Sequence, residues 1–401
     1  MPETAHPEAA AAPVDYVSLL SSIRRRLHKY PELGMQEIQT AKFIRNTLAS
    51  FGLEVHGPVA QTGLYVDIRG AHPGPLVGYR ADIDALPIQE LSETPYRSQH
   101  DGVAHLCGHD AHTAIGIGVA LLVHQRREAL HGTVRVFFQP NEEGMPSGAP
   151  LMIADGVIDG MEAAYAIHVD PTLDVGQYGT IIGPVTAAVD QFEVTVDARS
   201  TGHSARPHQA HDTVWIATLM AQQAYQLIGR ITDARNPAVL TICRFNGSPA
   251  YNVIPAKVDF GGTIRSTDPD DRDLIKTQLQ ALAEHLGMLY DVSMHVDFQG
   301  GAPAIQNDKR LIQHIEHHIS RLFHADDIVR LRVPSMGSED FAHYADRIPG
   351  VLLRVGTASS DATRYPLHDA HFDIDEACLF PTARLMADVV LTHGAEQIVG
   401  G

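Results

Sequence analysis

The sequence alternates predicted helices with short apolar strands over most of its length, and this order is the feature that most constrains the fold. Apolar residues at helical spacing, or in a continuous apolar run, predict helices over 16–28, 36–50 and 113–126. Between them, runs rich in Val, Ile, Phe and Tyr predict strands at 63–68, 75–79, 133–138 and 164–167. Such an alternation is typical of an α/β domain whose mixed, mostly parallel sheet is covered by helices on both faces.

Between residues 186 and 301 the predicted order changes to β-α-β-β-α-β, which is the split βαβ arrangement of a ferredoxin-like α+β sheet. Glycine and proline at 183–184 and 300–303 supply boundaries for this segment. Because 401 residues are also too many for one compact core, we expect two domains. The expected parts are a disordered arm (1–14), a main domain (15–185 and 302–401) and an inserted domain (186–301).

The charge of the chain limits its partners and its compartment. A formal net charge of −18 argues against a nucleic-acid surface, which needs clustered Lys and Arg. No apolar run approaches the ~18 residues that cross a bilayer, and the acidic, proline-containing start does not resemble a signal peptide. Cys107, Cys243 and Cys378 are three cysteines far apart, which makes a disulfide framework improbable. We therefore expect a cytoplasmic protein that acts on small molecules and binds neither nucleic acid nor membrane.

A cluster of possible metal ligands occupies residues 105–112, His-Leu-Cys-Gly-His-Asp-Ala-His. If this segment is extended, Cys107 and His109 lie on one face, and Gly108 has no Cβ to obstruct an ion. Thiolate and imidazole both suit zinc and its neighbours. The alternative is a buried cysteine beside a helix cap at Asp110. Most of the 24 histidines must be structural, and His314, His317 and His318 are expected on an exposed helix.

Three further segments carry polar groups just where a predicted strand ends: Asp82, the pair Glu142-Glu143, and His168. The carboxyl ends of parallel strands meet at one edge of a sheet, so these groups are expected to converge. Neighbouring glutamates point in different directions, which allows one to bind a metal ion while the other faces a water molecule. That division suits metal-assisted hydrolysis. A solvated loop is the alternative for an isolated Glu-Glu pair.

Five motifs in this order resemble those of a known group of enzymes. The motifs are Arg80-Ala-Asp-Ile-Asp-Ala-Leu-Pro-Ile88, Cys107-Gly-His-Asp-Ala-His112, Phe138-Gln-Pro-Asn-Glu-Glu-Gly144, Ala166-Ile-His168 and Gly337-Ser-Glu-Asp-Phe341. They are similar to motifs of the dinuclear-metal amidohydrolases, which include bacterial N-acyl-amino-acid aminoacylases, hippurate hydrolases and plant auxin-conjugate hydrolases. The resemblance extends from Leu27-His28 to Leu367-His368. It implies a metallopeptidase-like catalytic domain and an inserted lid or dimerisation domain.

The resemblance also implies a role for each matching residue. Cys107 would bridge two divalent metal ions, with zinc as the first expectation and manganese, cobalt or nickel as further ones. Glu142 would be the general base, and Asp82 would orient a ligand. Arg80 occupies the position of a metal-binding histidine in the peptidase relatives, which leaves His109 as the substitute ligand. The remaining ligands would be His109, Glu143, His168 and His368, with His368 matching the motif better than His371 and with His105 and His112 only flanking the loop.

In the inserted domain, His203 matches the histidine that polarises the scissile carbonyl, often in the neighbouring subunit's site. Asn252 and Arg265 resemble the residues that receive the substrate carboxylate, although Arg265 could equally be an exposed strand residue. The resemblance therefore implies a homodimer or dimer-based oligomer that hydrolyses N-acyl-L-amino acids through a metal-bridging hydroxide. A dipeptidase or carboxypeptidase using the same site, and a non-catalytic metal-binding protein of the same fold, are the alternatives.

Overall fold

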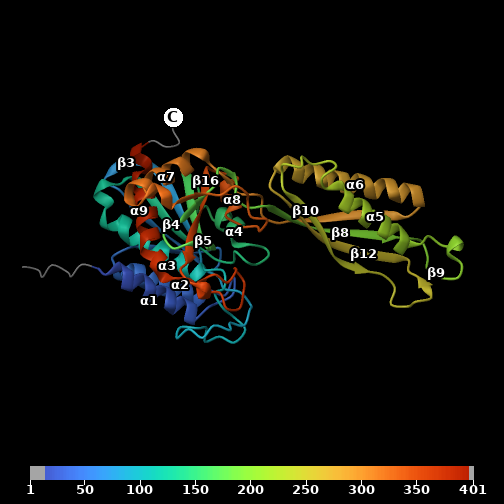
Figure 1. Cartoon of the computed structure of the whole chain (residues 1–401), viewed down its shortest axis with the longest axis horizontal. Coiled ribbons are helices and arrows are strands. Elements are labelled where there is room, and N and C mark those ends of the chain that lie inside the picture. The colour runs from blue at the N-terminus through green and yellow to red at the C-terminus, as the bar shows by residue number, and fades with distance from the viewer. Residues whose placement is uncertain (1–13, 397–401) are drawn as a thin grey trace, which may run out of the picture.

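The computed structural model describes residues 14–396, in two parts that the chain connects at two crossings (Figure 1). The larger part contains both ends of the described chain, and the smaller part projects from it. A short antiparallel pair, β7 (Gly183–Pro184) with β14 (Gln306–Asn307), lies where the chain leaves and returns. The predicted N-terminal arm falls almost entirely on residues 1–13, outside the described residues.

The main domain is built on an eight-stranded sheet with the strand order β1-β2-β4-β3-β5-β16-β6-β15. Its four adjacent central strands, β4, β3, β5 and β16, are parallel to one another, whereas β1–β2, β2–β4 and β16–β6 pair antiparallel. The sheet is therefore mixed with a parallel centre, as the alternation of elements predicted. The strands are β1 (Val55–Val59), β2 (Gly63–Arg69), β3 (His72–Asp82), β4 (His131–Gln139), β5 (Met161–Asp174), β6 (Tyr178–Thr180), β15 (Ile328–Arg330) and β16 (Gly350–Ala358).

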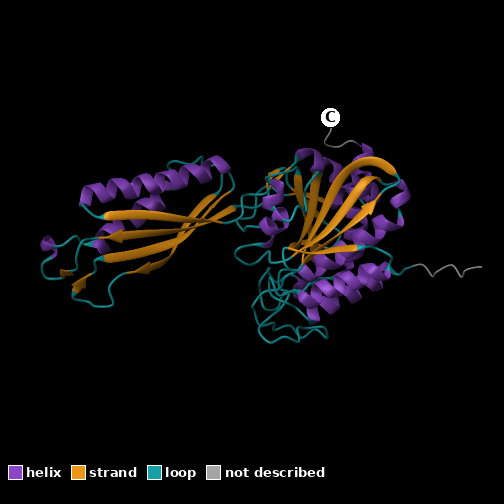
Figure 2. Cartoon of the chain, turned by 180° about the vertical axis from the view of Figure 1, so that it is seen from behind, coloured by secondary structure: helices purple, strands orange, loops and turns teal. Residues whose placement is uncertain are grey.

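Helices cover both faces of this sheet unevenly (Figure 2). One face carries the larger apolar core, to which five helices contribute: α1 (Tyr16–Lys29), α2 (Ile38–Ser50), α3 (His109–Gln125), α7 (Lys309–Leu322) and α9 (Leu379–Glu396). The other face packs against two short helices, α4 (Gly148–Ala154) and α8 (Ala342–Ala345). Residues 109–123 of α3 are all buried, which explains why this segment is apolar around its whole circumference.

The inserted domain is a four-stranded antiparallel sheet with the order β10-β12-β8-β13 and two helices on one side. Its alternating strands bury Phe192, Val194 and Val196 beneath the helices. A small pair, β9 with β11, lies at the end farthest from the main domain (Figure 1). The elements are β8 (Ala188–Asp197), β9 (Gly202–His203), α5 (Thr213–Leu227), β10 (Ala238–Asn246), β11 (Val253–Ile254), β12 (Lys257–Ser266), α6 (Pro269–Tyr290) and β13 (Ser293–Gly300).

Two expectations about local structure are wrong. The first expected a strand that ends at His168. β5 instead continues to Asp174, and His168 lies beyond the last residue of β5 that pairs with β3. The second expected the histidines of α7 to be exposed. His314 and His318 are buried, because that face of α7 packs on α9. None of the helices within residues 14–396 is both long and apolar enough to cross a membrane.

Candidate active site

The loop before α3 folds differently from the extended segment that the sequence suggested. Gly108 adopts a left-handed conformation (φ 86°), and His109 is already the first residue of α3. A Cβ on Gly108 would lie 2.4 Å from Cγ2 of Val169. Glycine is therefore required here by the turn and by its close approach to β5, rather than by space for an ion. The turn still brings Cys107 and His109 to the same buried place.

The five predicted metal ligands come together at the carboxyl edge of the sheet. The candidate ligand atoms of Cys107, His109 and His168 lie within 4.8 Å of one another, as do those of Cys107, Glu143 and His368. Cys107 is thus common to two triads. Its Sγ lies 3.6 Å from Nε2 of His168, and Nε2 of His368 lies 3.0 Å from Oε1 of Glu143. A thiolate shared by two triads has the geometry that a bridging ligand needs.

Both buried imidazoles are oriented through Nδ1, which leaves Nε2 directed at the cluster. His109 Nδ1 lies 3.0 Å from the carbonyl oxygen of Asp84 and 3.1 Å from its Oδ1, and His168 Nδ1 lies 2.8 Å from the carbonyl oxygen of Val169. His109 Nε2 is buried without a hydrogen-bond partner. Burial holds the pKa of His168 well below its usual range, so this ring is neutral. Metal-binding histidines are typically held in this way by an acceptor behind the ring.

Asp84 is a site residue that the sequence reasoning missed. Besides facing His109, its Oδ2 accepts a hydrogen bond of 3.0 Å from the backbone N–H of Glu143. Asp82, which was predicted to orient a ligand, has its Oδ1 2.6 Å from His112 Nδ1, and its Oδ2 is 3.6 Å from His109 Nε2. Asp84 stands two residues after Asp82 in the same motif, just beyond the end of β3, so a second carboxylate at this strand end was the available signal.

Arg80 is fully buried and pairs with three carboxylates, consistent with its not being a metal ligand. Its guanidinium lies 2.7 Å from Oδ2 of Asp82, 3.0 Å from Oε1 of Glu339 and 2.7 Å from Oδ1 of Asp340. These contacts connect the end of β3 to the segment 339–340 that precedes α8. One cation therefore fixes two of the family-like motifs against each other beneath the cluster.

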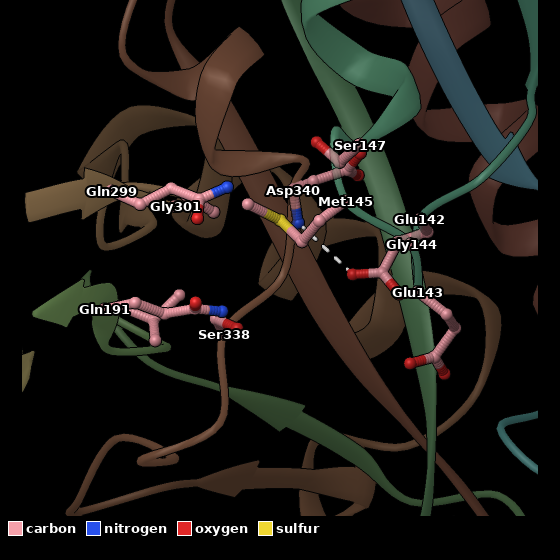
Figure 3. Close-up of a pocket in the computed structure, with 12 residues that line it drawn as sticks. Glu142, Glu143, Gly144, Met145, Ser147, Gln191, Gln299, Gly301, Ser338 and Asp340 are labelled. Carbon is pink, nitrogen blue, oxygen red and sulfur yellow. Dashed lines mark hydrogen bonds between the residues drawn. The ribbon is translucent and has the colours of Figure 1, made fainter. Parts of the chain in front are cut away.

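Glu142 lines the cavity that also contains the predicted ligands. Its Oε1 accepts a 3.3 Å hydrogen bond from the backbone N–H of Asp340, as the view of an adjoining cavity shows (Figure 3). Withdrawal from solvent, together with the charges of Glu339 and Asp340, raises the pKa of Glu142 well above its usual range. A carboxylate with a raised pKa binds a proton more readily at neutral pH. The metal-ligand cavity has a volume of about 330 Å³ and is also lined by Arg265, Ser335 and residues 337–339.

The three predicted residues of the inserted domain lie in two different places. Arg265 lines the cavity, and its Nη1 donates a 2.8 Å hydrogen bond to the carbonyl of Met336. His203 ends β9 and Asn252 directly precedes β11, with the Ser204 N–H donating to the Asn252 carbonyl, at the far end of the inserted domain (Figure 1). One chain therefore does not bring His203 or Asn252 to its own metal-ligand cluster.

His112 and His371 near the site have structural contacts. His112 Nε2 accepts a 3.1 Å hydrogen bond from the Val169 N–H, and the ring of His371 lies 3.1 Å from Oδ1 of Asp369. His105 is buried without a partner for either nitrogen, and burial lowers its pKa to about 4. His368 has a positive φ of 68°, and its N–H donates to the carbonyl of Leu106. This connection ties the His368 loop to the loop that carries Cys107.

Similarity to known proteins agrees with this geometry. A probable hydrolase of Synechocystis sp. is 37% identical over 380 residues, covering 94% of this chain and 95% of that protein. An N-acetyl-L-cysteine deacetylase of Bacillus subtilis is 35% identical over 382 residues, covering 95% and 88%. A crystal structure described as a dinuclear metal-binding peptidase of the M20 family, also from Bacillus subtilis, superimposes with a TM-score of 0.84 at 33% identity and covers 95% of this chain and 99% of its own.

The family itself is identified by a match over most of the chain. Residues 78–392, which include the five predicted metal ligands and Glu142, match the model of peptidase family M20/M25/M40. Relatives that share this length are named as hydrolases, deacetylases, an amidohydrolase and thermostable carboxypeptidases. The chain belongs to peptidase family M20/M25/M40 and is a metal-dependent amidohydrolase.

Proposed function

We propose that this protein hydrolyses the amide bond of N-acyl-L-amino acids with two divalent metal ions and with Glu142 as general base. The observation that carries the proposal is the position of Glu142. It lines the same cavity as Cys107, Glu143, His168 and His368, and its carboxylate lies within 4.8 Å of ligand atoms of His109 and Glu143 while its Oε1 accepts a hydrogen bond from the Asp340 N–H. A protein that only stored metal would have no use for a carboxylate poised beside the ligands.

The donor set fits divalent metal ions of the zinc type. It combines one thiol, three imidazoles and one carboxylate, all acceptable to zinc, manganese, cobalt or nickel. His109 Nε2 is an orphaned buried nitrogen that an ion would satisfy. Burial raises the pKa of the Cys107 thiol to about 12, so it needs a bound cation to ionise at neutral pH. Cys107, His109 and His168 would hold one ion, and Cys107, Glu143 and His368 the other.

The proposed mechanism divides the work between the chain and its metals. Two bound divalent ions would supply Lewis-acid activation of water and of the amide carbonyl. Glu142 takes the proton from the attacking water and returns it to the leaving nitrogen, which must therefore sit beside it. The raised pKa of Glu142 favours its accepting that proton. Asp84 keeps His109 and the backbone of Glu143 in place throughout.

Several features support an N-acyl amino acid as the substrate. Two divalent ions outweigh the charges of the Cys107 thiolate and Glu143, so the loaded centre attracts a carboxylate. Arg265 lines the cavity with a planar fork suited to carboxylate binding. The Bacillus subtilis relative is named for the deacetylation of N-acetyl-L-cysteine, which is a compound of this class. His203 and Asn252 would reach the site from the inserted domain of a partner subunit in a homodimer.

The test compares wild type with Glu142→Ala and Cys107→Ala after loading with a defined metal. Substrates are acetyl, benzoyl and long-chain acyl amino acids, and metal content is measured by elemental analysis. Glu142→Ala should keep two metal ions while kcat falls by about 10²- to 10⁴-fold, the usual contribution of general acid–base catalysis. Cys107→Ala should lose metal as well as activity. Undiminished turnover by Glu142→Ala would refute the mechanism.

A matched surface control is Glu128→Ala, since Glu128 is 82% exposed on the turn after α3. It should leave both metal content and turnover unchanged. Dipeptides belong in the same substrate panel. Faster hydrolysis of dipeptides than of every N-acyl amino acid would replace the proposed substrate class with that of a dipeptidase or carboxypeptidase, without changing the roles of Glu142 and Cys107.

A further inference from the structure

Arg354 lies in the middle of β16, between β5 and β6 in the sheet. In the sheet it is paired with His168 on β5 and with Gly179 on β6. A Cβ on Gly179 would lie 3.0 Å from Cβ of Arg354, so the glycine leaves room for the arginine side chain. Arg354 lines the metal-ligand cavity together with Cys107 and His168. The sequence offered no motif that would have selected it.

The Arg354 guanidinium makes no hydrogen bond or ion pair with any residue in 14–396, although the side chain is partly buried. Other buried or partly buried arginines of the described chain have such partners: Arg24, Arg45, Arg80, Arg126, Arg135, Arg265 and Arg272. None of its nitrogens is among the fully buried atoms that lack a partner, so the guanidinium is open to the cavities that Arg354 lines. A guanidinium kept in this state is available to bind an anion from outside the chain.

The position beside His168 makes an external anion more necessary. On the proposed function, His168 holds a divalent ion, and a second positive group next to that ion is repelled by it. A carboxylate of the substrate would relieve the repulsion and satisfy the guanidinium in one bidentate contact. The α-carboxylate of an N-acyl amino acid is already assigned to Arg265, which borders the same cavity from the inserted domain. Arg354 is therefore left for a different negative group.

We propose that Arg354 is a specificity-determining residue that binds a second carboxylate of the substrate. The enzyme would then prefer N-acyl amino acids that carry a carboxylate in addition to the α-carboxylate. This inference rests on the proposed function and deepens it by naming the substrate class. The second carboxylate can belong to the acyl group, as in an N-succinyl amino acid, or to an acidic amino-acid side chain.

The cavities around Arg354 favour the acyl group. Glu142 borders the metal-ligand cavity and the adjoining cavity of Figure 3, so the leaving amine and its amino acid lie on that side. Arg354 instead separates the metal-ligand cavity from a third cavity of about 480 Å³. Its lining is mainly apolar. Asp170 also lines it, but the Oδ1 of Asp170 accepts hydrogen bonds from the N–H and the hydroxyl of Thr172. The apolar lining residues are Pro171, Ile181, Val185, Leu331, Val333, Pro334, Pro366 and Leu367.

The test uses three substrates on metal-loaded enzyme: N-acetyl-L-alanine, N-succinyl-L-alanine and N-acetyl-L-glutamate. Wild type should show a kcat/KM about 10- to 100-fold higher for the succinyl compound than for N-acetyl-L-alanine, as expected for one charge-assisted contact. Arg354→Gln should abolish that preference by raising KM for the succinyl compound. Its kcat/KM for N-acetyl-L-alanine should stay within about threefold of the wild-type value, and its metal content should be unchanged. Arg354→Lys should retain part of it, since it keeps the charge without the fork.

The exposed Arg332 gives a matched control, because it lies between Leu331 and Val333 in a segment that lines the third cavity. Arg332→Gln should leave kcat/KM unchanged for all three substrates. A preference for N-acetyl-L-glutamate that Arg354→Gln removes would support the role of Arg354 and assign the carboxylate to the amino-acid half. Absence of any preference in wild type, or an equal loss for all three substrates in Arg354→Gln, would overturn the inference.

A binding measurement separates this inference from the proposed function. In titration calorimetry, metal-loaded wild type should bind succinate about tenfold or more tightly than propionate, and Arg354→Gln should lose the difference. If no N-acyl amino acid is hydrolysed, the proposed function fails while this comparison still tests Arg354. Equal binding of succinate and propionate by wild type would refute the second-carboxylate site even if hydrolysis of N-acetyl amino acids is found.

Discussion

His28, on the buried face of α1, should make the stability of the main domain depend on pH. Its Nδ1 lies 2.8 Å from Oδ2 of Asp110 and its Nε2 lies 3.2 Å from Oε1 of Glu90, and the His28 side chain is 1% exposed. Asp110 follows the predicted ligand His109 in the first turn of α3, and it also accepts a 2.9 Å hydrogen bond from Arg24. The His28 contact therefore connects α1 to the start of the helix that carries the ligand.

The magnitude follows from the pKa of this imidazole. Burial alone would lower it, but the charge and hydrogen bond of Asp110, with the hydrogen bond to Glu90, outweigh burial and raise the pKa of His28 to about 9. A raised pKa gives stability that is fully present below the ordinary value of 6.5 and is lost as pH rises through 9. The difference of pKa corresponds to about 3 kcal/mol in the free energy of unfolding.

The assay is urea unfolding of metal-free wild type and His28→Gln between pH 6 and 10, followed by far-ultraviolet circular dichroism. The single tryptophan, Trp215, lies on α5 of the inserted domain. Its fluorescence is an internal control, because the unfolding that it reports should not differ between wild type and His28→Gln. The exposed His317 of α7 gives the matched variant His317→Gln. The advantage of wild type over His28→Gln should shrink by about 3 kcal/mol as pH rises. An advantage that is constant or grows with pH would refute the assignment of a charged His28.

Two further predictions concern the active site and the inserted domain. Asp84→Ala should weaken metal binding about 10- to 100-fold, because it removes the carboxylate behind His109 and the acceptor for the Glu143 N–H. Competition with a chromophoric chelator measures the metal affinity, and an unchanged affinity would contradict the role of Asp84. His203→Ala and Glu142→Ala, each inactive alone, should regain about a quarter of wild-type activity when co-expressed. About half of the dimers are then mixed, and one of the two sites in each mixed dimer is complete. No recovery in a purified mixed dimer would exclude action of His203 across subunits.

Residues close together in a motif were the part of the site that the sequence could predict. Cys107 and His109 share one turn. Glu143 follows the end of β4, and His168 lies on β5 just beyond its last pair with β3, and the apolar runs had already placed both strands in a parallel sheet. Their convergence follows from sheet topology, which local patterns determine well. The conformation of the loop was not predictable in the same way, because the left-handed Gly108 is required by Val169, 61 residues later in the chain.

Residues whose role depends on distant neighbours escaped the sequence reasoning. His314 and His318 have the spacing of any polar helix face, and only packing on α9 shows that they contact the Val389 carbonyl and the Thr392 hydroxyl. Arg354 interrupts an apolar strand, which by itself indicates neither burial nor a binding role. What it faces is decided by the strands on either side of β16, which no local pattern encodes.

The charges around the candidate site are unevenly distributed, and this asymmetry links metal binding to substrate choice. On the Glu142 side, Arg80 faces the three carboxylates of Asp82, Glu339 and Asp340, and burial together with the charge of Glu339 raises the pKa of Asp340 to about 7. Divalent ions would offset this negative excess. On the other side, Arg354 has no carboxylate partner within the described chain, and the same ions would increase rather than offset its charge. Metal loading should therefore strengthen the need for an anion beside Arg354, so that the metal-loaded protein should bind succinate more tightly than the metal-free protein does.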